Sequence, residues 1–144
     1  MTKFQNWSLF LLRITIGWLF LNAGLNHLLD PAFSAVGYLN KAATFSALFN
    51  ALASPSILPI VNFLVIWGLI LLGIALILGI FVRWSGYLGA VLMFLLYLPV
   101  LNFPVVGHGY IVDDHIIFIA GLLTLAAFKA GRVWGLAMRW KWLD

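Results

Sequence analysis

One short segment of this chain gathers groups that can carry chemistry. Asp113, Asp114 and His115 follow one another directly, in a chain with only four acidic residues. They open a long apolar run, where charge is costly unless it is solvated, paired or functional. Carboxylates beside an imidazole raise its pKa, so such a group can pass protons or donate a hydrogen bond to a carbonyl.

A second polar group lies at the end of the first apolar run. Asn22, Asn26 and His27 are followed by Asp30 and a proline. If the first and last apolar runs are neighbours, these residues and the 113–115 segment form one His–Asp cluster, over which His108 could fold. The predicted catalytic residues are Asp114, His115 and His27. The predicted ligand contacts are His115, Asn26, Asn22 and Asp113.

Each of these residues also has a structural interpretation. One aspartate of the pair would cap the last helix, and Asp30 with its proline would simply end the first. The two asparagines would join helices by hydrogen bonds. At roughly 100° per helical residue, His115 is expected to point away from Asp113. The sequence leaves chemistry and capping open.

The composition indicates a membrane protein. Hydrophobic residues make up 65% of the 144 residues and charged residues 8%, against roughly 25% charged in soluble domains. No cysteine is present, which excludes disulfides, thiol catalysis, Cys-ligated zinc and iron–sulfur clusters. The basic residues lie beside apolar runs and form no nucleic-acid-binding face.

Hydropathy predicts an all-α fold, an integral membrane four-helix bundle in a single domain, 1–144. The predicted spans cover about 8–29, 57–82, 84–101 and 111–128. Between the first two, apolar residues recur at spacings of three and four, which predicts an interfacial or re-entrant helical segment. A tight turn at residues 83–86 joins the second and third spans.

The cations predict the orientation. Of eight Lys and Arg, only Lys41 falls on the second side of a four-span arrangement. The positive-inside rule then places both termini in the cytoplasm, with the chain in the cytoplasmic (plasma) membrane. Residues 129–144 form a cytoplasmic amphipathic tail on anionic lipid. Arg13, inside the first span, is expected to be a structural charge that reaches headgroups or a backbone carbonyl.

The first span has two unusual faces. Gly17, Gly24 and His27 share one face, whereas Asn22 and Asn26 share the opposite one. Glycines favour close helix approach, and amides do not suit bare lipid. We therefore expect this span to be central, with protein or a cavity on both sides.

The presence of two histidines, His27 and His115, makes haem binding and metal binding alternatives to consider. Axial haem ligation by His27 and His115 needs both rings to face one cavity. A metal site would use the same histidines with Asp114. Neither alternative has further support in the sequence, so the prediction includes no haem, metal or nucleotide.

Short motifs run in order along nearly the whole chain. They are LRITIGWLF with AG at 12–24, HLLDP at 27–31, LGIALILG with Arg83 at 72–83, and VDDHII leading to AGR at 112–132. With these motifs the chain resembles the DoxX/DoxD family of small four-span bacterial and archaeal membrane proteins. The resemblance implies a four-helix membrane bundle and a link to quinone-coupled oxidoreduction. Some members are subunits of a thiosulfate:quinone oxidoreductase or are named for a terminal quinol oxidase.

The chain departs from this family at three places. Many relatives carry Glu where this chain has Leu69, and often Lys where it has His27. They have Asp-Glu-His or Asp-Asn-His where this chain has Asp113-Asp114-His115. The missing Glu confines any proton path to the 113–115 segment.

The leading hypothesis is a quinone-interacting membrane subunit of an oxidoreductase. His115, with Asp114, would be the quinone or proton ligand. The donor, thiosulfate or a related small sulfur species by resemblance, would be oxidised at the outer face. Quinone is the suspected cofactor, and lipid plus a partner subunit or homo-oligomer are the expected partners. The alternatives are a non-enzymatic scaffold or assembly subunit and a small-solute channel or transporter.

Overall fold

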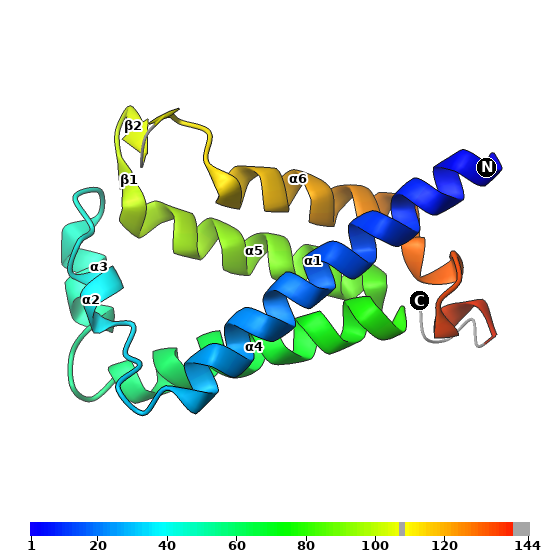
Figure 1. Cartoon of the computed structure of the whole chain (residues 1–144). Helices are drawn as coiled ribbons and strands as arrows, with labels where there is room; N and C mark the ends of the chain where they lie inside the picture. Colours follow the sequence, from blue (N-terminus) through cyan, green and yellow to red (C-terminus); the bar gives the residue numbers. More distant parts are fainter. Residues whose placement is uncertain (107–108, 140–144) are drawn as a thin grey trace.

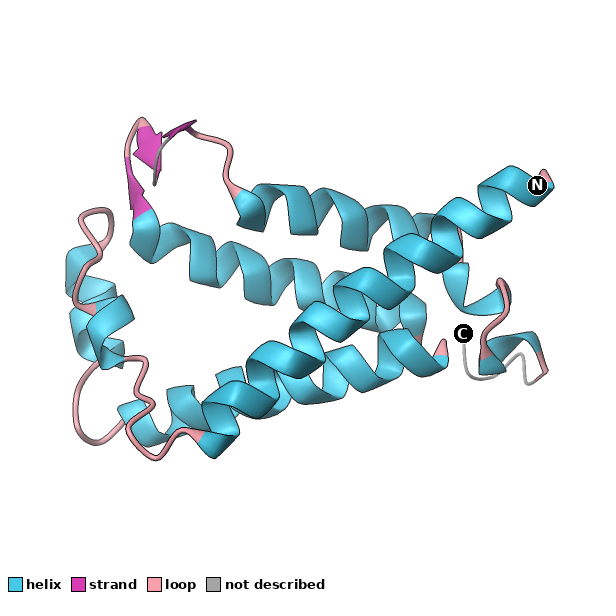
Figure 2. Cartoon of the chain, viewed as in Figure 1, coloured by secondary structure: helices cyan, strands magenta, loops and turns pink. Residues whose placement is uncertain are grey.

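Four helices dominate the computed structural model, which describes residues 1–106 and 109–139 (Figures 1 and 2). These helices are α1 (Lys3–Leu29), α4 (Leu58–Leu78), α5 (Val82–Val100) and α6 (Asp114–Ala127). The first three are long and apolar enough to cross a membrane. With 14 residues, α6 is about 21 Å long, shorter than a hydrocarbon core of roughly 30 Å. The chain is a mostly helical membrane protein with several candidate spans.

The helix boundaries correct two predictions. The tight turn lies at residues 79–81, and residues 83–86 are already inside α5. Gly79 ends α4 with φ 70°, a left-handed conformation that glycine adopts without steric cost. In addition, α1 begins at Lys3, where Thr2 and Gln5 exchange hydrogen bonds in a capping box. Lys3 and the polar residues before the predicted span are therefore helical.

Among the described residues, five short elements connect the long helices and two follow the last one. They are α2 (Val36–Leu39), α3 (Ser46–Leu52), β1 (Leu101–Asn102), β2 (Val105–Val106), β3 (Gly109–Tyr110), η1 (Ala130–Arg132) and η2 (Leu136–Met138). The segment between the first two spans is thus helical in short pieces, as predicted. The three strands form an antiparallel sheet in the order β1-β2-β3, with Asn102 opposite Val105 and Val105 opposite Tyr110. This small sheet is a departure from the all-α prediction.

The bundle has two different ends. The start of α1, the α4–α5 turn, η1 and η2 lie at one end, which we call the tail end (Figure 1). The short helices α2 and α3 and the sheet lie at the other, which we call the loop end (Figure 1).

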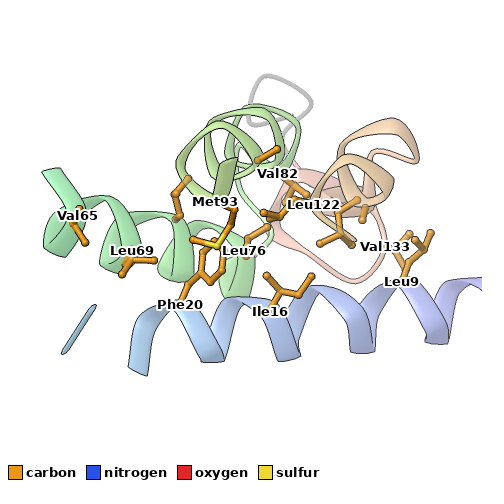
Figure 3. Close-up of a cluster of buried hydrophobic side chains, with 14 residues drawn as sticks. Leu9, Ile16, Phe20, Val65, Leu69, Leu76, Val82, Met93, Leu122 and Val133 are labelled. Atoms are coloured by element: carbon orange, nitrogen blue, oxygen red, sulfur yellow. The ribbon is translucent and has the colours of Figure 1, made fainter. Parts of the chain in front are cut away.

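The helices form two tightly packed pairs. In the first pair, glycines let the backbones of α1 and α4 touch: a Cβ added at Gly73 would lie 2.8 Å from the carbonyl oxygen of Gly17. In the second, a Cβ at Gly86 of α5 would lie 2.7 Å from the carbonyl oxygen of Leu122 in α6. The pairs meet across a core of apolar side chains that includes Phe20, Leu76, Met93 and Leu122 (Figure 3).

The expectation that α1 is covered on both sides is wrong for a single chain. Its Gly17/Gly24 face packs against α4, as the glycines predict. On the opposite face, Asn22 and Asn26 are exposed. No other described segment of the chain covers them.

Arg13 is fully buried at the tail end. Its Nη2 donates to the carbonyl oxygen of Trp134 at 3.3 Å, so the guanidinium reaches a backbone carbonyl, the second of the two predicted alternatives. The indole of Trp134 packs against Trp7 and Phe10, with ring centroids 4.6 and 5.4 Å apart. Arg13 therefore ties the first span to the C-terminal segment.

The segment after α6 packs into the protein. Val133 and Ala137 are buried, and the amide of Ala137 donates to the carbonyl oxygen of Gly79 at 3.1 Å. As far as it is described, the segment consists of η1, η2 and turns. Residues 140–144 of the predicted tail lie outside the described residues.

Candidate functional site

A pocket of about 340 Å³ lies between the two helix pairs on the loop side of the core. This volume is within the range of roughly 300–1,000 Å³ that small-molecule sites occupy. Every long helix and the 33–38 segment contribute to its walls. The apolar lining is Leu19, Phe20, Ala23, Phe33, Ala35, Val65, Leu69, Met93, Leu96 and Phe118. The polar lining is His27, Ser34, Tyr38 and His115.

One hydrogen-bonded chain of side chains reaches this pocket. Nδ1 of His115 lies 2.7 Å from Oδ2 of Asp113, and its Nε2 lies 3.3 Å from the hydroxyl of Tyr38. The Tyr38 hydroxyl has one proton, which it donates either to the carbonyl oxygen of Leu96 or to Nε2 of a neutral His115. Since a carboxylate only accepts, we assign the Nδ1 proton to the bond with Asp113. We call Asp113, His115 and Tyr38 the proton chain.

Asp113 has two roles because its two carboxylate oxygens have different partners. Oδ1 accepts from the amides of His115 and Ile116, at 3.0 and 3.3 Å, and so caps α6. Oδ2 is left to orient the imidazole. The expectation that His115 points away from Asp113 is wrong, because Asp113 is extended (φ −131°, ψ −170°) and the helical angle does not apply to it.

Several predicted site residues lie outside the pocket. Asp114 is exposed in the first turn of α6, and Asn22 and Asn26 are exposed on the opposite side of α1 from α4. Asp30 ends α1, as predicted, and accepts from the amide of Ala32 at 2.9 Å. His108 lies outside the described residues. The pocket thus brings together His27 and His115, with Asp113 behind the second ring.

Tyr38 was not among the predicted site residues. It reaches the pocket because the segment after α1 folds back over the loop end, where Asn62 of α4 accepts from the amide of Ala35 at 2.9 Å. In the sequence, the only indication of this role was a tyrosine within the segment of mixed polar and apolar residues between the first two spans. Only the fold shows that this hydroxyl faces His115.

A strained turn holds Asp113 in place. Ile111 has φ 59°, a left-handed conformation that β-branched residues rarely adopt. Its amide donates to the carbonyl oxygen of Pro104 at 3.0 Å, and its carbonyl accepts from the Tyr97 hydroxyl. Strain of this kind persists where surrounding contacts over-determine the backbone.

His27 and Leu69 belong to the pocket wall. The ring of His27 stacks on Phe33, with centroids 4.0 Å apart and planes 22° apart. Leu69 is 4% exposed and also faces the pocket. The wall at this position is therefore apolar in this chain.

Burial and charge keep Tyr38 protonated. Burial, and to a smaller extent the negative charge of Asp113, raise the pKa of Tyr38 to about 12. At neutral pH its hydroxyl is therefore a stable hydrogen-bond donor. If His115 takes up a proton, Nε2 becomes a donor to the Tyr38 oxygen, and Tyr38 keeps its bond to Leu96. The chain of bonds thus accommodates both protonation states of the imidazole.

The arrangement around the histidines does not suggest a metal centre. Among the described residues, no group of three His, Cys, Asp or Glu side chains is placed to hold a metal ion. Both nitrogens of His115 already have partners. The chemistry that this site offers is hydrogen bonding and proton transfer next to an apolar cavity.

Comparison with protein-family models gives a match. The family model DoxX matches residues 8–102, which contain most of α1, all of α4 and α5, and most of the pocket wall. Neither the curated proteins nor the solved structures include a match. Because the family model covers well over half of the sequence, the chain belongs to the DoxX family.

Proposed function

We propose that this chain is the membrane subunit of a quinone-coupled oxidoreductase and that the pocket receives the quinone head group. The observation that carries the proposal is the proton chain, which ends in an apolar cavity on the loop side of a membrane bundle. Sites for apolar ligands typically combine such walls with a few placed polar groups.

The volume and lining of the pocket support the choice of a quinone. A quinone ring is apolar on its faces and has carbonyl oxygens that accept hydrogen bonds. Tyr38 supplies a protonated hydroxyl and His27 a second polar group, both on the pocket wall. A bound quinone would supply the redox chemistry, because its reduction takes up two electrons and two protons.

The residues of the proton chain would deliver these protons. Tyr38 would turn its hydroxyl proton from the Leu96 carbonyl to the quinone carbonyl, and His115, after taking up a proton at Nε2, would return it to Tyr38. Asp113 would hold the imidazole and balance its charge when protonated. The side chains of His115 and Asp113 are 25% and 18% exposed, so protons can enter from the loop end.

The electrons would come from elsewhere. The chain has no cysteine and no haem or nucleotide motif, so we infer that a partner subunit delivers electrons. Family resemblance suggests thiosulfate or a related small sulfur species as the donor. With four spans and cytoplasmic termini, the loop end and its pocket would lie at the outer face of the plasma membrane.

One support of the scaffold alternative is gone. The small-residue face of α1 was expected to hold another membrane protein, and Gly17 and Gly24 on that face are covered by α4. That face is not available to another protein. We therefore favour ligand binding.

The test is quinone binding by the purified protein in lipid nanodiscs, measured by calorimetry with short-chain ubiquinone and menaquinone analogues. Tyr38→Phe should weaken binding about 5- to 10-fold, the value of one hydrogen bond. Asp113→Asn should also weaken binding, because the side chain can still cap α6 but no longer carries the charge that orients His115.

Asp114→Asn is the matched control, since it makes the same change one residue away at an exposed position. It should leave the affinity unchanged. The proposal fails if neither quinone binds, or if both Asn variants have the same effect. If quinone binds, a second experiment measures the reduction of quinone by thiosulfate in the presence of the co-purified partner.

A further inference from the structure

One face of α1 remains uncovered along its whole length. Its residues recur at alternating spacings of four and three, the pattern by which one helix packs along another. We call this stripe the α1 seam; it consists of Phe4, Ser8, Leu11, Thr15, Trp18, Asn22, Leu25 and Leu29, all of them exposed. In Figure 1, α1 crosses the near side of the bundle.

The polar side chains of the seam are not all satisfied. The hydroxyls of Ser8 and Thr15 donate to carbonyls of their own helix, at 3.0 and 2.9 Å. Asn22 differs, because its amide has no hydrogen-bond partner among the described residues. Eight residues before Asp30, Asn22 lies about 12 Å inside the end of the helix. An unpaired amide at that depth is costly in hydrocarbon.

Trp18 adds to this problem. It is 64% exposed on the same face, one turn before Asn22, and its indole N–H likewise has no partner among the described residues. Tryptophan favours the membrane interface over the interior. A seam with two unsatisfied polar side chains indicates a surface that another helix covers.

We propose that a second copy of this chain covers the α1 seam, in a parallel two-fold dimer in which the two Asn22 side chains pair. An amide has both a donor and an acceptor, so Asn22 is complementary to itself across a two-fold axis. Copies inserted with the same topology present parallel α1 helices. Asparagines at the core position of such a pair fix its register.

The dimer does not depend on the proposed function. The seam and the pocket use different faces of α1, since the pocket is lined by Phe20, Ala23 and His27. Loss of the dimer and loss of quinone binding can therefore be observed separately.

Absence of cysteine allows a direct test by disulfide cross-linking in native membranes. Leu11→Cys and Leu25→Cys place single thiols on the seam. Leu71→Cys on α4 and Leu88→Cys on α5 are controls at other exposed leucines, each 60% exposed. After oxidation with copper phenanthroline, the seam variants should form an adduct of twice the chain mass, and the controls should not.

Asn22→Leu tests the amide pair itself. In the Leu25→Cys background it should raise the dimer dissociation constant about 3- to 20-fold, the value of an interhelical amide bond. Thr15→Val should change it little, because the Thr15 hydroxyl is already bonded within its helix. The proposal is overturned by cross-links of equal yield at all four positions, by an adduct with a different protein, or by an unchanged constant in Asn22→Leu.

Discussion

The tail end and the loop end of this bundle are built from the same four helices, yet only one of them is closed. At the tail end, Arg13 is buried beside Gly79 and Gly135, and the segment after α6 seals the helices. At the loop end, His27 and Tyr38 line a cavity between the helix pairs. At the tail end, glycines allow the buried guanidinium and the C-terminal segment to pack closely against the helices. At the loop end, the two helix pairs are separated by a pocket that has space for a ligand.

The largest loss of stability should come from adding a single methyl group at the tail end. A Cβ in Gly79→Ala would collide with the Arg13 guanidinium and lie 2.6 Å from Cα of Gly135, at a position with φ 70°. We expect a loss of about 3 kcal/mol in unfolding free energy, from overpacking and left-handed strain. Gly37→Ala at the loop end is the control, because nothing lies within 4 Å of its Cβ.

Thermal unfolding in detergent measures both alanine variants. A large drop for Gly79→Ala beside an unchanged Gly37→Ala supports the difference between the ends. Similar values for the two would show that the tail end is not tightly packed.

The next effect is the loss of the Arg13 tether. Arg13→Ala removes a fully buried side chain and the bond to Trp134, which should lower the unfolding free energy by about 2–3 kcal/mol. It should also expose residues 134–138 to limited proteolysis. Arg13→Met fills the volume without the hydrogen bond, so it should lose less stability yet still release the segment. Protection of the segment in both variants would contradict the tether.

A smaller effect concerns protonation at the loop end. Tyr38 should ionise near pH 12, above the ordinary pKa of 10.0. Because the folded pKa is the higher one, the stabilisation is fully present below pH 10 and is lost as the pH rises through 12. The difference in tyrosinate absorbance between the wild type and Tyr38→Phe measures this titration.

Replacing the neighbouring aspartates sharpens the same measurement. Asp113→Asn should lower the pKa of Tyr38, since the Asp113 charge contributes to raising it. The exposed Asp114 is absent from the causes of that shift, so Asp114→Asn should leave the midpoint where it is. A Tyr38 midpoint near pH 10 in the wild type would mean that the phenol is solvated.

Local signals in the sequence predicted much of the fold. Apolar runs of the right length located the long helices, Asp30 with Pro31 marked the end of α1, and an aspartate of the pair was expected to cap α6. The glycines of α1 predicted a close helix contact. Each of these features depends on residues near one another in the chain, so pattern and propensity were sufficient.

Only some residues of the candidate site could be predicted from the sequence. His27 and His115 face one pocket, as the cluster hypothesis required. Tyr38 was missed because its position depends on distant contacts, such as Asn62 with Ala35. The helical angle misplaced His115 because it cannot show that Asp113 lies outside the helix. Asn22 was assigned to the site because the sequence shows that it is a polar residue in an apolar span but does not show which residues surround it.

The bond between Arg13 and Trp134 has a consequence for the order of assembly. These residues are 121 positions apart, so the acceptor for the charge on the first span is synthesised long after that span enters the membrane. Until then, the guanidinium must be hydrated or held by the insertion machinery. Burial of Arg13 is therefore a late event, and the nascent chain completes its tail end only when the final segment arrives.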